Sequence, residues 1–477
     1  MLFNSFEFLI FFPVVTALYF LLPHKFRWIL LLLASCTFYM FFVPYYILIL
    51  IVTILIDYFA AIYISQSTGK KRKTYLIISI ISTCLVLFAF KYFNFFNDNL
   101  KLLAHVAHWN YPIPALKILL PIGLSFHTFQ SLSYVIEVYR GNQKVEKHFG
   151  IYALYVMFYP QLVAGPIERP QNILHQFYEK HHFDYDDVTH GLKQMLRGYL
   201  KKVVIADRLS IYVNAVYNNH THHNGTSLLL ATVLFAFQIY CDFSGYSDIA
   251  IGSARVMGFK LMTNFNRPYF AKSISEFWKR WHISLSTWFK DYVYIPLGGN
   301  RVIMPLVYVN LLITFLLSGL WHGANWTYVI WGGLNGFYLV IGVLFYKVKS
   351  KINHDLENQH LKKLNQFLNI LTTFILILFS WVFFRATSFT DALNIIKKIL
   401  FDHGPLFIGN NKDLIYSVCF LSLLLIVELF EEYKLFNNFS LYNNRNTLVR
   451  HLTYYSVIII IMLFGVFDSS QFIYFQF

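Results

Sequence analysis

Residues 45–64 read YYILILIVTILIDYFAAIYI, a run of twenty residues with a single charge at Asp57. A helix needs about 20 mainly apolar residues to cross a hydrocarbon core about 30 Å thick. The basic run Lys70–Lys73 comes shortly after it. Lys and Arg concentrate in the cytoplasmic loops of membrane proteins. This part of the chain therefore predicts a membrane-spanning helix that ends on the cytoplasmic side.

Comparable apolar stretches occur on both sides of this one, which makes about twelve candidate spans. The others are Phe6–Leu22, Trp28–Val43, Tyr75–Phe96, Ala115–Val138, Phe149–Ala164, Ser227–Gly258, Ile303–Leu320, Asn325–Tyr346, Leu368–Phe384, Leu414–Leu429 and Tyr454–Phe467. The chain shows no linker, internal repeat or low-complexity segment. We predict an all-α, polytopic membrane protein with 11–12 transmembrane helices and a single domain over residues 1–477.

The composition supports a lipid environment. Hydrophobic residues make up 57% of the chain and charged residues 13%, about half the charged share of a typical soluble domain. The net charge of +15 comes from Lys and Arg in the short segments between apolar runs, which indicates membrane orientation and argues against nucleic-acid binding. The four cysteines lie inside apolar segments, so neither a disulfide framework nor a metal site is predicted.

A count of spans, with Lys70–Lys73 placed in the cytoplasm, agrees with the positive-inside rule at one basic segment and conflicts with it at another. Six candidate spans separate Lys70–Lys73 from the basic segment Lys347–Lys351, so both lie in the cytoplasm, as their charge requires. The same count puts the basic stretch 169–208 outside. Residues 167–208 and 264–301 are too polar to span and rich in aromatic residues, and we expect them to be re-entrant or to lie along a surface.

Two histidines are candidate catalytic residues. His322 stands in SGLWHGANWT (318–327), where one apolar stretch ends and the next begins. His282 follows FWKRW (277–281). A neutral imidazole can act as a general base near neutral pH. The alternative interpretation is a hydrogen-bonded packing histidine for His322 and an interfacial aromatic belt for His282.

Charged residues also occur within or beside apolar stretches. Asp242 and Asp248 lie in YCDFSGYSD (240–248), about 120° apart on a helix, which is unsuited to a paired acid–base dyad. Ion pairs with Lys or Arg are the simpler expectation for them. GPIERP (165–170) predicts a turn with Glu168 and Arg169 facing a cavity.

Several of these motifs together resemble the membrane-bound O-acyltransferase family, and within it the bacterial branch that O-acetylates alginate and related polymers. The resemblance rests on FWKRWHISLSTWFKDYVYIPLGGNR (277–301), GLWHGANWT (319–327), CDFSGYSDIAIG (241–252), GPIERP and the closing FIYFQF. These motifs occur in the order of the family and extend to the last residue.

The resemblance implies an enzyme with a defined set of site residues. His322 would be the general base, and His282 would orient or stabilise the thioester carbonyl. We expect substrate contacts from residues in the same motifs, namely Trp281, Asn325, Arg280, Asp242 and Tyr246. No bound cofactor or metal is implied. The donor would be acetyl-CoA from the cytoplasm.

The same resemblance implies a cellular location, a partner protein and an acceptor. The protein would be a multi-pass protein of a bacterial inner membrane that works with a periplasmic acetyltransferase of SGNH type on an extracytoplasmic polysaccharide such as alginate, cellulose or peptidoglycan. One position departs from the pattern, because relatives often have histidine where this chain has Asn335. Three alternatives stay open, namely D-alanyl transfer to teichoic acid, a transporter or flippase, and an anchor without chemistry.

Overall fold

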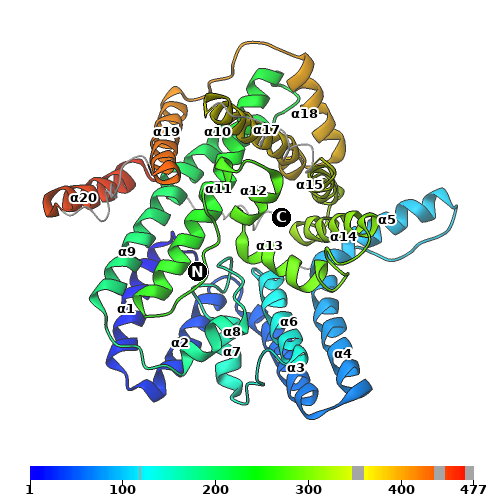
Figure 1. The fold of residues 1–477 in the computed structure, drawn as a ribbon, viewed down its shortest axis with the longest axis vertical. Helices are drawn as coiled ribbons and strands as arrows, with labels where there is room; N and C mark the ends of the chain where they lie inside the picture. The colour runs from blue at the N-terminus through cyan, green and yellow to red at the C-terminus, as the bar shows by residue number, and fades with distance from the viewer. Residues whose placement is uncertain (118–119, 346–358, 435–445, 468–477) are drawn as a thin grey trace. The chain divides into compact units, whose positions relative to one another are not determined.

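The computed structural model describes residues 1–117, 120–345, 359–434 and 446–467. This part of the chain is built from helices and contains no strand, which confirms the all-α class (Figure 1). The residues cluster into two compact units. Unit 1 comprises 1–195 and 247–262, and unit 2 comprises 196–246 and 263–477.

Unit 1 contains the N-terminal helices and short parts of two later ones. Its helices are α1 (Phe6–Leu21), α2 (His24–Met40), η1 (Pro44–Tyr46), α3 (Ile47–Gln66), α4 (Gly69–Leu87), η2 (Phe88–Tyr92), α5 (Phe93–Val106), α6 (Leu124–Arg140), α7 (Phe149–Met157), α8 (Pro170–Ile173), η3 (Leu174–Phe177), most of α9 (Tyr185–Tyr199) and the last turns of α11 (Gly225–Val256).

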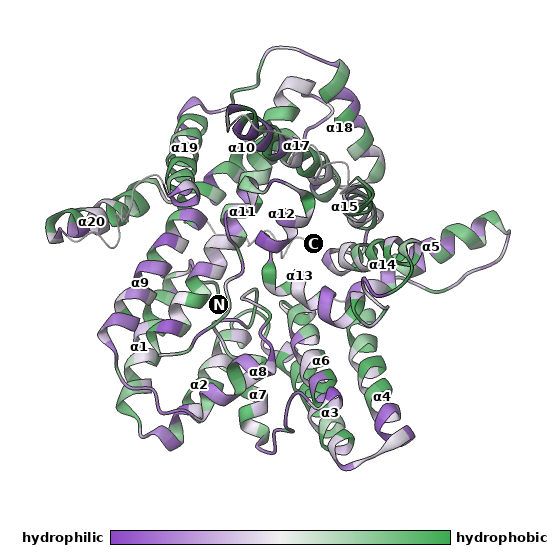
Figure 2. Cartoon of the chain, viewed as in Figure 1, coloured by the Kyte–Doolittle hydropathy of each residue, from purple (hydrophilic) through white to green (hydrophobic). Residues whose placement is uncertain are grey.

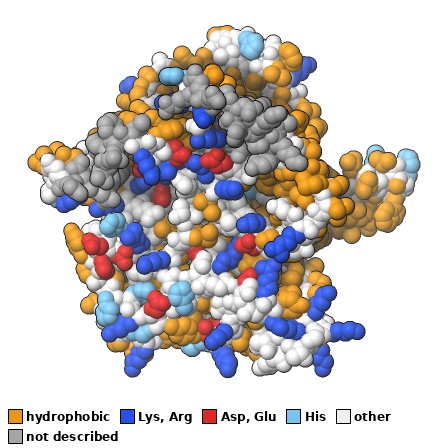
Figure 3. Space-filling model, viewed as in Figure 1, with side chains coloured by type: hydrophobic (Ala, Val, Ile, Leu, Met, Phe, Trp, Pro, Cys, Tyr) orange, Lys and Arg blue, Asp and Glu red, His pale blue; other side chains and the backbone are white. Residues whose placement is uncertain are grey.

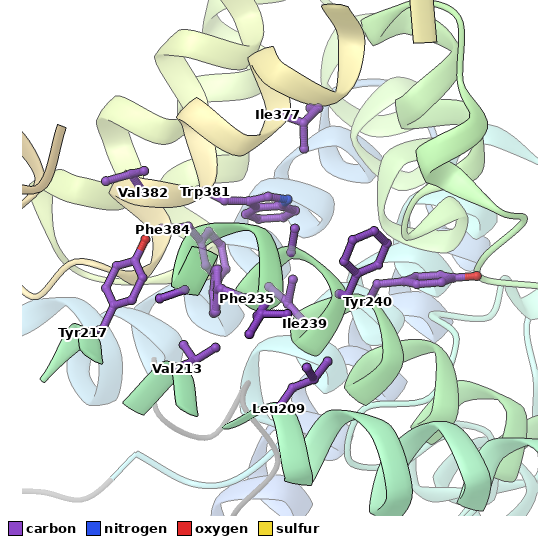
Figure 4. Close-up of a cluster of buried hydrophobic side chains, with 14 of the residues drawn as sticks. Leu209, Val213, Tyr217, Phe235, Ile239, Tyr240, Ile377, Trp381, Val382 and Phe384 are labelled. Carbon is purple, nitrogen blue, oxygen red and sulfur yellow. The ribbon is translucent and has the colours of Figure 1, made fainter. Parts of the chain in front are cut away.

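Unit 2 contains the remaining helices and both candidate histidines. After the end of α9 come η4 (Leu200–Ala206), α10 (Asp207–Tyr217), most of α11, η5 (Pro268–Phe270), α12 (Ile274–Arg280), α13 (Ile283–Phe289), η6 (Lys290–Tyr294), α14 (Met304–His322), α15 (Trp326–Leu344), α17 (Gln359–Arg385), α18 (Phe389–Phe401), α19 (Asn411–Tyr433) and α20 (Thr447–Phe464). Side chains of α10, α11 and α17, among them Val213, Phe235 and Trp381, form a buried hydrophobic cluster in this unit (Figure 4).

Within the described residues, eight helices are long and apolar enough to cross a membrane. The difference from the expected 11–12 comes from α1, α2, α6 and α7, which have 16, 17, 17 and 9 residues. Helices that would face lipid expose large apolar side chains, such as Met462 and Leu463 of α20, and α20 is largely hydrophobic in Figure 2. Helix α5 likewise exposes large apolar side chains, among them Leu102, Leu103 and Val106, and hydrophobic side chains predominate on it in Figure 3.

The predicted span Phe149–Ala164 does not cross the membrane. Helix α7 has nine residues, which at 1.5 Å per residue reaches less than half of a core about 30 Å thick. The Tyr178 hydroxyl donates to the Glu146 carboxylate at 2.8 Å, so the chain after α7 returns to the side from which α7 starts. Residues 149–169 are therefore re-entrant.

This return removes the conflict with the positive-inside rule for residues 169–183. Arg72, in the basic run at the start of α4, donates to the Tyr139 carbonyl at the end of α6 (2.6 Å). Arg27 donates to the His181 carbonyl (2.5 Å). The segment that the sequence count placed outside thus lies beside the basic ends of α2, α4 and α6, which the positive-inside rule assigns to the cytoplasm. Helical structure continues without a break from Tyr185 to Tyr217.

Glycines bring α14 and α15 into close contact just before His322. A Cβ atom on Gly319 would lie 2.2 Å from the Tyr328 carbonyl oxygen, and one on Gly332 would lie 2.2 Å from the Phe315 carbonyl oxygen. Both collisions are with backbone atoms, which cannot rotate away. Small residues allow helix backbones to approach in membranes, and here they set the position of the end of α14.

We therefore expect Gly319→Ala to destabilise the protein by about 1–3 kcal/mol, because the added methyl group must push the two helices apart. The measurement is the thermal unfolding midpoint of the full-length protein in nanodiscs. Gly342→Ala in α15 is the matched control, since its Cβ would meet no atom within 4 Å. Equal midpoints for the two variants would contradict this account of the helix pair.

Candidate active site

His322 is the last residue of α14. The helix ends there because Gly323 adopts an extended conformation, with φ of −160°. The His322 side chain is buried, at 5% exposure. Its ring is surrounded by Trp321, Trp331 and Phe384, with ring centroids 5.0, 5.0 and 5.4 Å away. An imidazole in such a low-dielectric, water-poor setting has the surroundings of a general base in a closed active site.

His282 stands at the corner between α12 and α13. It is fully buried and adopts a left-handed backbone conformation, with φ of 43°, which is uncommon for a residue other than glycine. Its Nδ1 atom lies 3.2 Å from Oδ1 of Asn264, and the edge of Phe243 packs against its ring at 4.5 Å. Burial lowers the pKa of His282 to about 3, so the ring is neutral near neutral pH.

The two histidines share a neighbour. The Trp321 ring lies 5.0 Å from His322 and 6.3 Å from His282. The structure therefore brings together, within unit 2, the two residues that the sequence places forty positions apart.

Trp281 and Arg280, which precede His282, have contacts of their own. Trp281 is buried and stacks on Phe277 at 5.4 Å and packs against Trp381 at 5.2 Å. Arg280 forms ion pairs with Glu276 and Glu432, at 2.7 and 2.8 Å. These contacts give Trp281 a packing role and Arg280 a place in an ion-pair network.

The network around Arg280 ties the end of α19 to the corner that bears His282. Glu432 also pairs with Arg267 at 2.8 Å, and Glu431 pairs with both Arg267 and Arg197. Several paired charges hold a geometry better than one isolated surface pair. The network is therefore suited to hold the segment that carries His282.

Asp242 forms the ion pair with a lysine that was the simpler expectation for it. The Lys202 ammonium lies 2.6 Å from Asp242 and 2.8 Å from Asp207, and all three side chains are buried. Tyr246, one turn further along α11, is buried as well. The triad is a structural element beside Phe243, and sequence reasoning missed Lys202 and Asp207 as its members.

Both asparagines near His322 use their amides within the fold. Asn325 caps α15, accepting from the Thr327 N–H at 3.0 Å and donating to the Thr387 carbonyl at 3.3 Å. Asn335 is fully buried and donates to the Trp331 carbonyl at 2.9 Å. These contacts make Asn325 a helix cap, which fixes the start of α15 next to His322.

Glu168 lines a cavity of about 770 Å³ within unit 1, as predicted from GPIERP, whereas Arg169, which was predicted to face a cavity as well, is not among its lining residues. Its carboxylate accepts from the Met262 N–H and from the Asn172 amide, and burial raises its pKa to about 7. The lining mixes four carboxylates with two lysines and three histidines. The carboxylates outnumber the lysines two to one, so the charge of the lining does not favour an anionic ligand.

In the described part of the chain, no group of three His, Cys, Asp or Glu side chains is placed to hold a metal ion. The pair His322 and His282 offers a geometry that is suited to acid–base chemistry. A neutral imidazole is able to take a proton from a hydroxyl group and return it to a leaving group.

Residues 147–388 match the model of the membrane-bound O-acyltransferase family. The chain is 40% identical over 392 residues to the probable alginate O-acetylase AlgI of Pseudomonas aeruginosa, covering 81% of this chain and 72% of that protein. It is 36% identical to the peptidoglycan O-acetyltransferase of Helicobacter pylori, covering 78% and 73%. It is 29% identical to the teichoic acid D-alanyltransferase of Streptococcus thermophilus, covering 58% and 70%.

Proposed function

Because the chain belongs to the membrane-bound O-acyltransferase family, we propose that it moves an acetyl group from cytoplasmic acetyl-CoA across the membrane for O-acetylation of an extracytoplasmic polysaccharide. The enzyme is a multi-pass membrane O-acyltransferase. The observation that carries the proposal is the pair of buried histidines that share Trp321. Acetyl is favoured over D-alanyl because the more similar relatives are named for O-acetylation.

In the proposed reaction an acceptor hydroxyl oxygen attacks the thioester carbonyl carbon. A new C–O bond forms, and collapse of the tetrahedral intermediate breaks the C–S bond. His322 takes the hydroxyl proton and then delivers it to the departing thiolate, so the products are an ester and the free thiol. A positioned general base is typically worth about 10²–10⁴ in rate.

The aromatic surroundings of His322 support this role. Trp321, Trp331 and Phe384 surround the imidazole, and apolar surroundings that keep water away protect a thioester from hydrolysis. We infer further that the acetyl group passes first to a periplasmic acetyltransferase of SGNH type, in line with the bacterial branch that the motifs resemble. That partner then esterifies the polymer.

The test compares a strain lacking this gene with the same strain carrying wild-type protein or empty vector. Ester-linked acetate and ester-linked D-alanine are measured on the cell envelope and on secreted polysaccharide. We expect acetate to return only with the wild-type protein. Return of D-alanine alone would replace acetyl transfer by D-alanyl transfer. Unchanged ester content, with altered uptake of a labelled substrate, would favour a transporter.

A further inference from the structure

The side-chain amide of Asn264 turns one of its two terminal atoms toward His282, and the partners of that atom show whether it is the oxygen or the nitrogen. The atom facing His282 also accepts from the Ser284 backbone N–H at 3.2 Å and from the Ser284 hydroxyl at 2.9 Å. A backbone N–H can only donate, so this atom must be the amide oxygen and not the nitrogen. Amide orientation is often ambiguous in asparagine, but these contacts remove the ambiguity here.

Because that atom is an oxygen, it determines which ring nitrogen of His282 carries the proton. An amide oxygen has no hydrogen to donate, so the 3.2 Å contact requires the imidazole proton to be on Nδ1. The Ser284 hydroxyl lies 3.5 Å from the same nitrogen and already donates to Asn264. A neutral imidazole carries one ring proton, and Nε2 therefore keeps its lone pair.

Backbone hydrogen bonds hold Asn264 next to His282. The Ile283 N–H donates to the Asn264 carbonyl at 2.9 Å, and the Asn266 N–H donates to the Arg280 carbonyl at 2.9 Å. Segments on either side of the His282 corner are thus paired with the Asn264 segment. Asn264 and His282 are both buried, so water does not compete for the contact.

We propose that Asn264 is a positioning residue that fixes the tautomer of His282, so that Nε2 of this histidine accepts a hydrogen bond from a substrate O–H or N–H group during acyl transfer. The role in transfer rests on the function proposed above. It also changes the role expected for His282 from the sequence. Stabilising a developing oxyanion would require a proton on Nε2, whereas this tautomer makes Nε2 an acceptor.

The first measurement reads the tautomer without relying on activity. Full-length protein with isotope-labelled histidine rings is studied in lipid by solid-state NMR, where ring-nitrogen chemical shifts separate the two neutral tautomers from imidazolium. The His282 signals are assigned by their loss in His282→Gln. We expect the proton on Nδ1 in the wild-type protein. A proton on Nε2 would overturn the proposal.

The second measurement uses Asn264→Asp and Asn264→Leu. The carboxylate of Asn264→Asp keeps an acceptor at Nδ1 but favours imidazolium, so the acid limb of the pH–rate profile should move to higher pH and activity should recover in alkali. Asn264→Leu has similar volume and no acceptor, and we expect the rate to fall about 10–100-fold at every pH, as for loss of an orienting partner. A purely structural role would change neither the pH profile nor the tautomer.

Ser284→Ala is the matched control, because it removes a hydroxyl donor to Asn264 and keeps the contact between Asn264 and His282. Its tautomer and pH profile should match the wild type. An unchanged tautomer and profile in both Asn264 variants would refute the positioning role. Wild-type protein with the Nδ1 tautomer but no acyl transfer would refute the proposed function and leave the tautomer assignment standing, so the two failures are distinguishable.

Discussion

His322→Gln should lower the rate of acetyl transfer by about 10²–10⁴-fold, the usual value of a positioned general base. Glutamine keeps a polar side chain of similar length but cannot take a proton near neutral pH. Because the histidine acts in the transition state, kcat should fall while KM for acetyl-CoA changes little. The measurement is the initial rate at which radiolabelled acetyl-CoA yields base-labile ester in membrane vesicles.

His105→Gln serves as the matched control for that experiment. His105 is an exposed histidine near the end of α5, so the same substitution there should leave the rate unchanged. The amount of each variant in the membrane must be equal, because His322 also contacts three aromatic rings. A near-wild-type rate for His322→Gln in well-folded protein would show that another group takes the proton.

The all-α membrane class was predictable because apolar length is a local property of the chain. Helix α3 begins at Ile47 and ends at Gln66, close to the predicted Tyr45–Ile64. The error at Phe149–Ala164 has a physical cause, since an apolar segment buried in protein looks the same in sequence as one that faces lipid. Every residue of α7 after Phe149 is buried, so its apolar character reflects the protein interior and not a crossing.

Within the candidate site, local sequence patterns were better at pointing out candidate residues than at predicting the side-chain contacts that those residues make. His322 and His282 were found because a histidine at a break between apolar stretches, or among Trp and Arg, is unusual. Asn264 was missed because its role depends on a contact with a residue eighteen positions away. Arg280 and Asn325 were expected to bind substrate because of their neighbours in the motifs, and the structure adds side-chain contacts to Glu432 and Thr387 that the sequence did not indicate. Long-range pairing of this kind has no signal in a single sequence.

The second large effect is on stability. Lys202→Met should destabilise the protein by about 3–5 kcal/mol, because removing one member of a buried ionic cluster leaves uncompensated charge. Here two carboxylates, Asp207 and Asp242, would remain buried without the ammonium between them. The thermal unfolding midpoint of the full-length protein in nanodiscs reports the change, and it should fall further than in Gly319→Ala.

Two comparisons make the Lys202 result interpretable. Lys397→Met replaces an exposed lysine of α18 and should leave the midpoint unchanged. Adding Asp207→Asn and Asp242→Asn to Lys202→Met removes the stranded charges, and since a buried ion pair contributes little net stability over neutral groups, most of the lost stability should return. If the triple variant is as unstable as Lys202→Met, the cost lies in packing and not in charge. If Lys202→Met is as stable as the wild type, the triad does not hold unit 2 together, and its buried charges would need a role in the reaction.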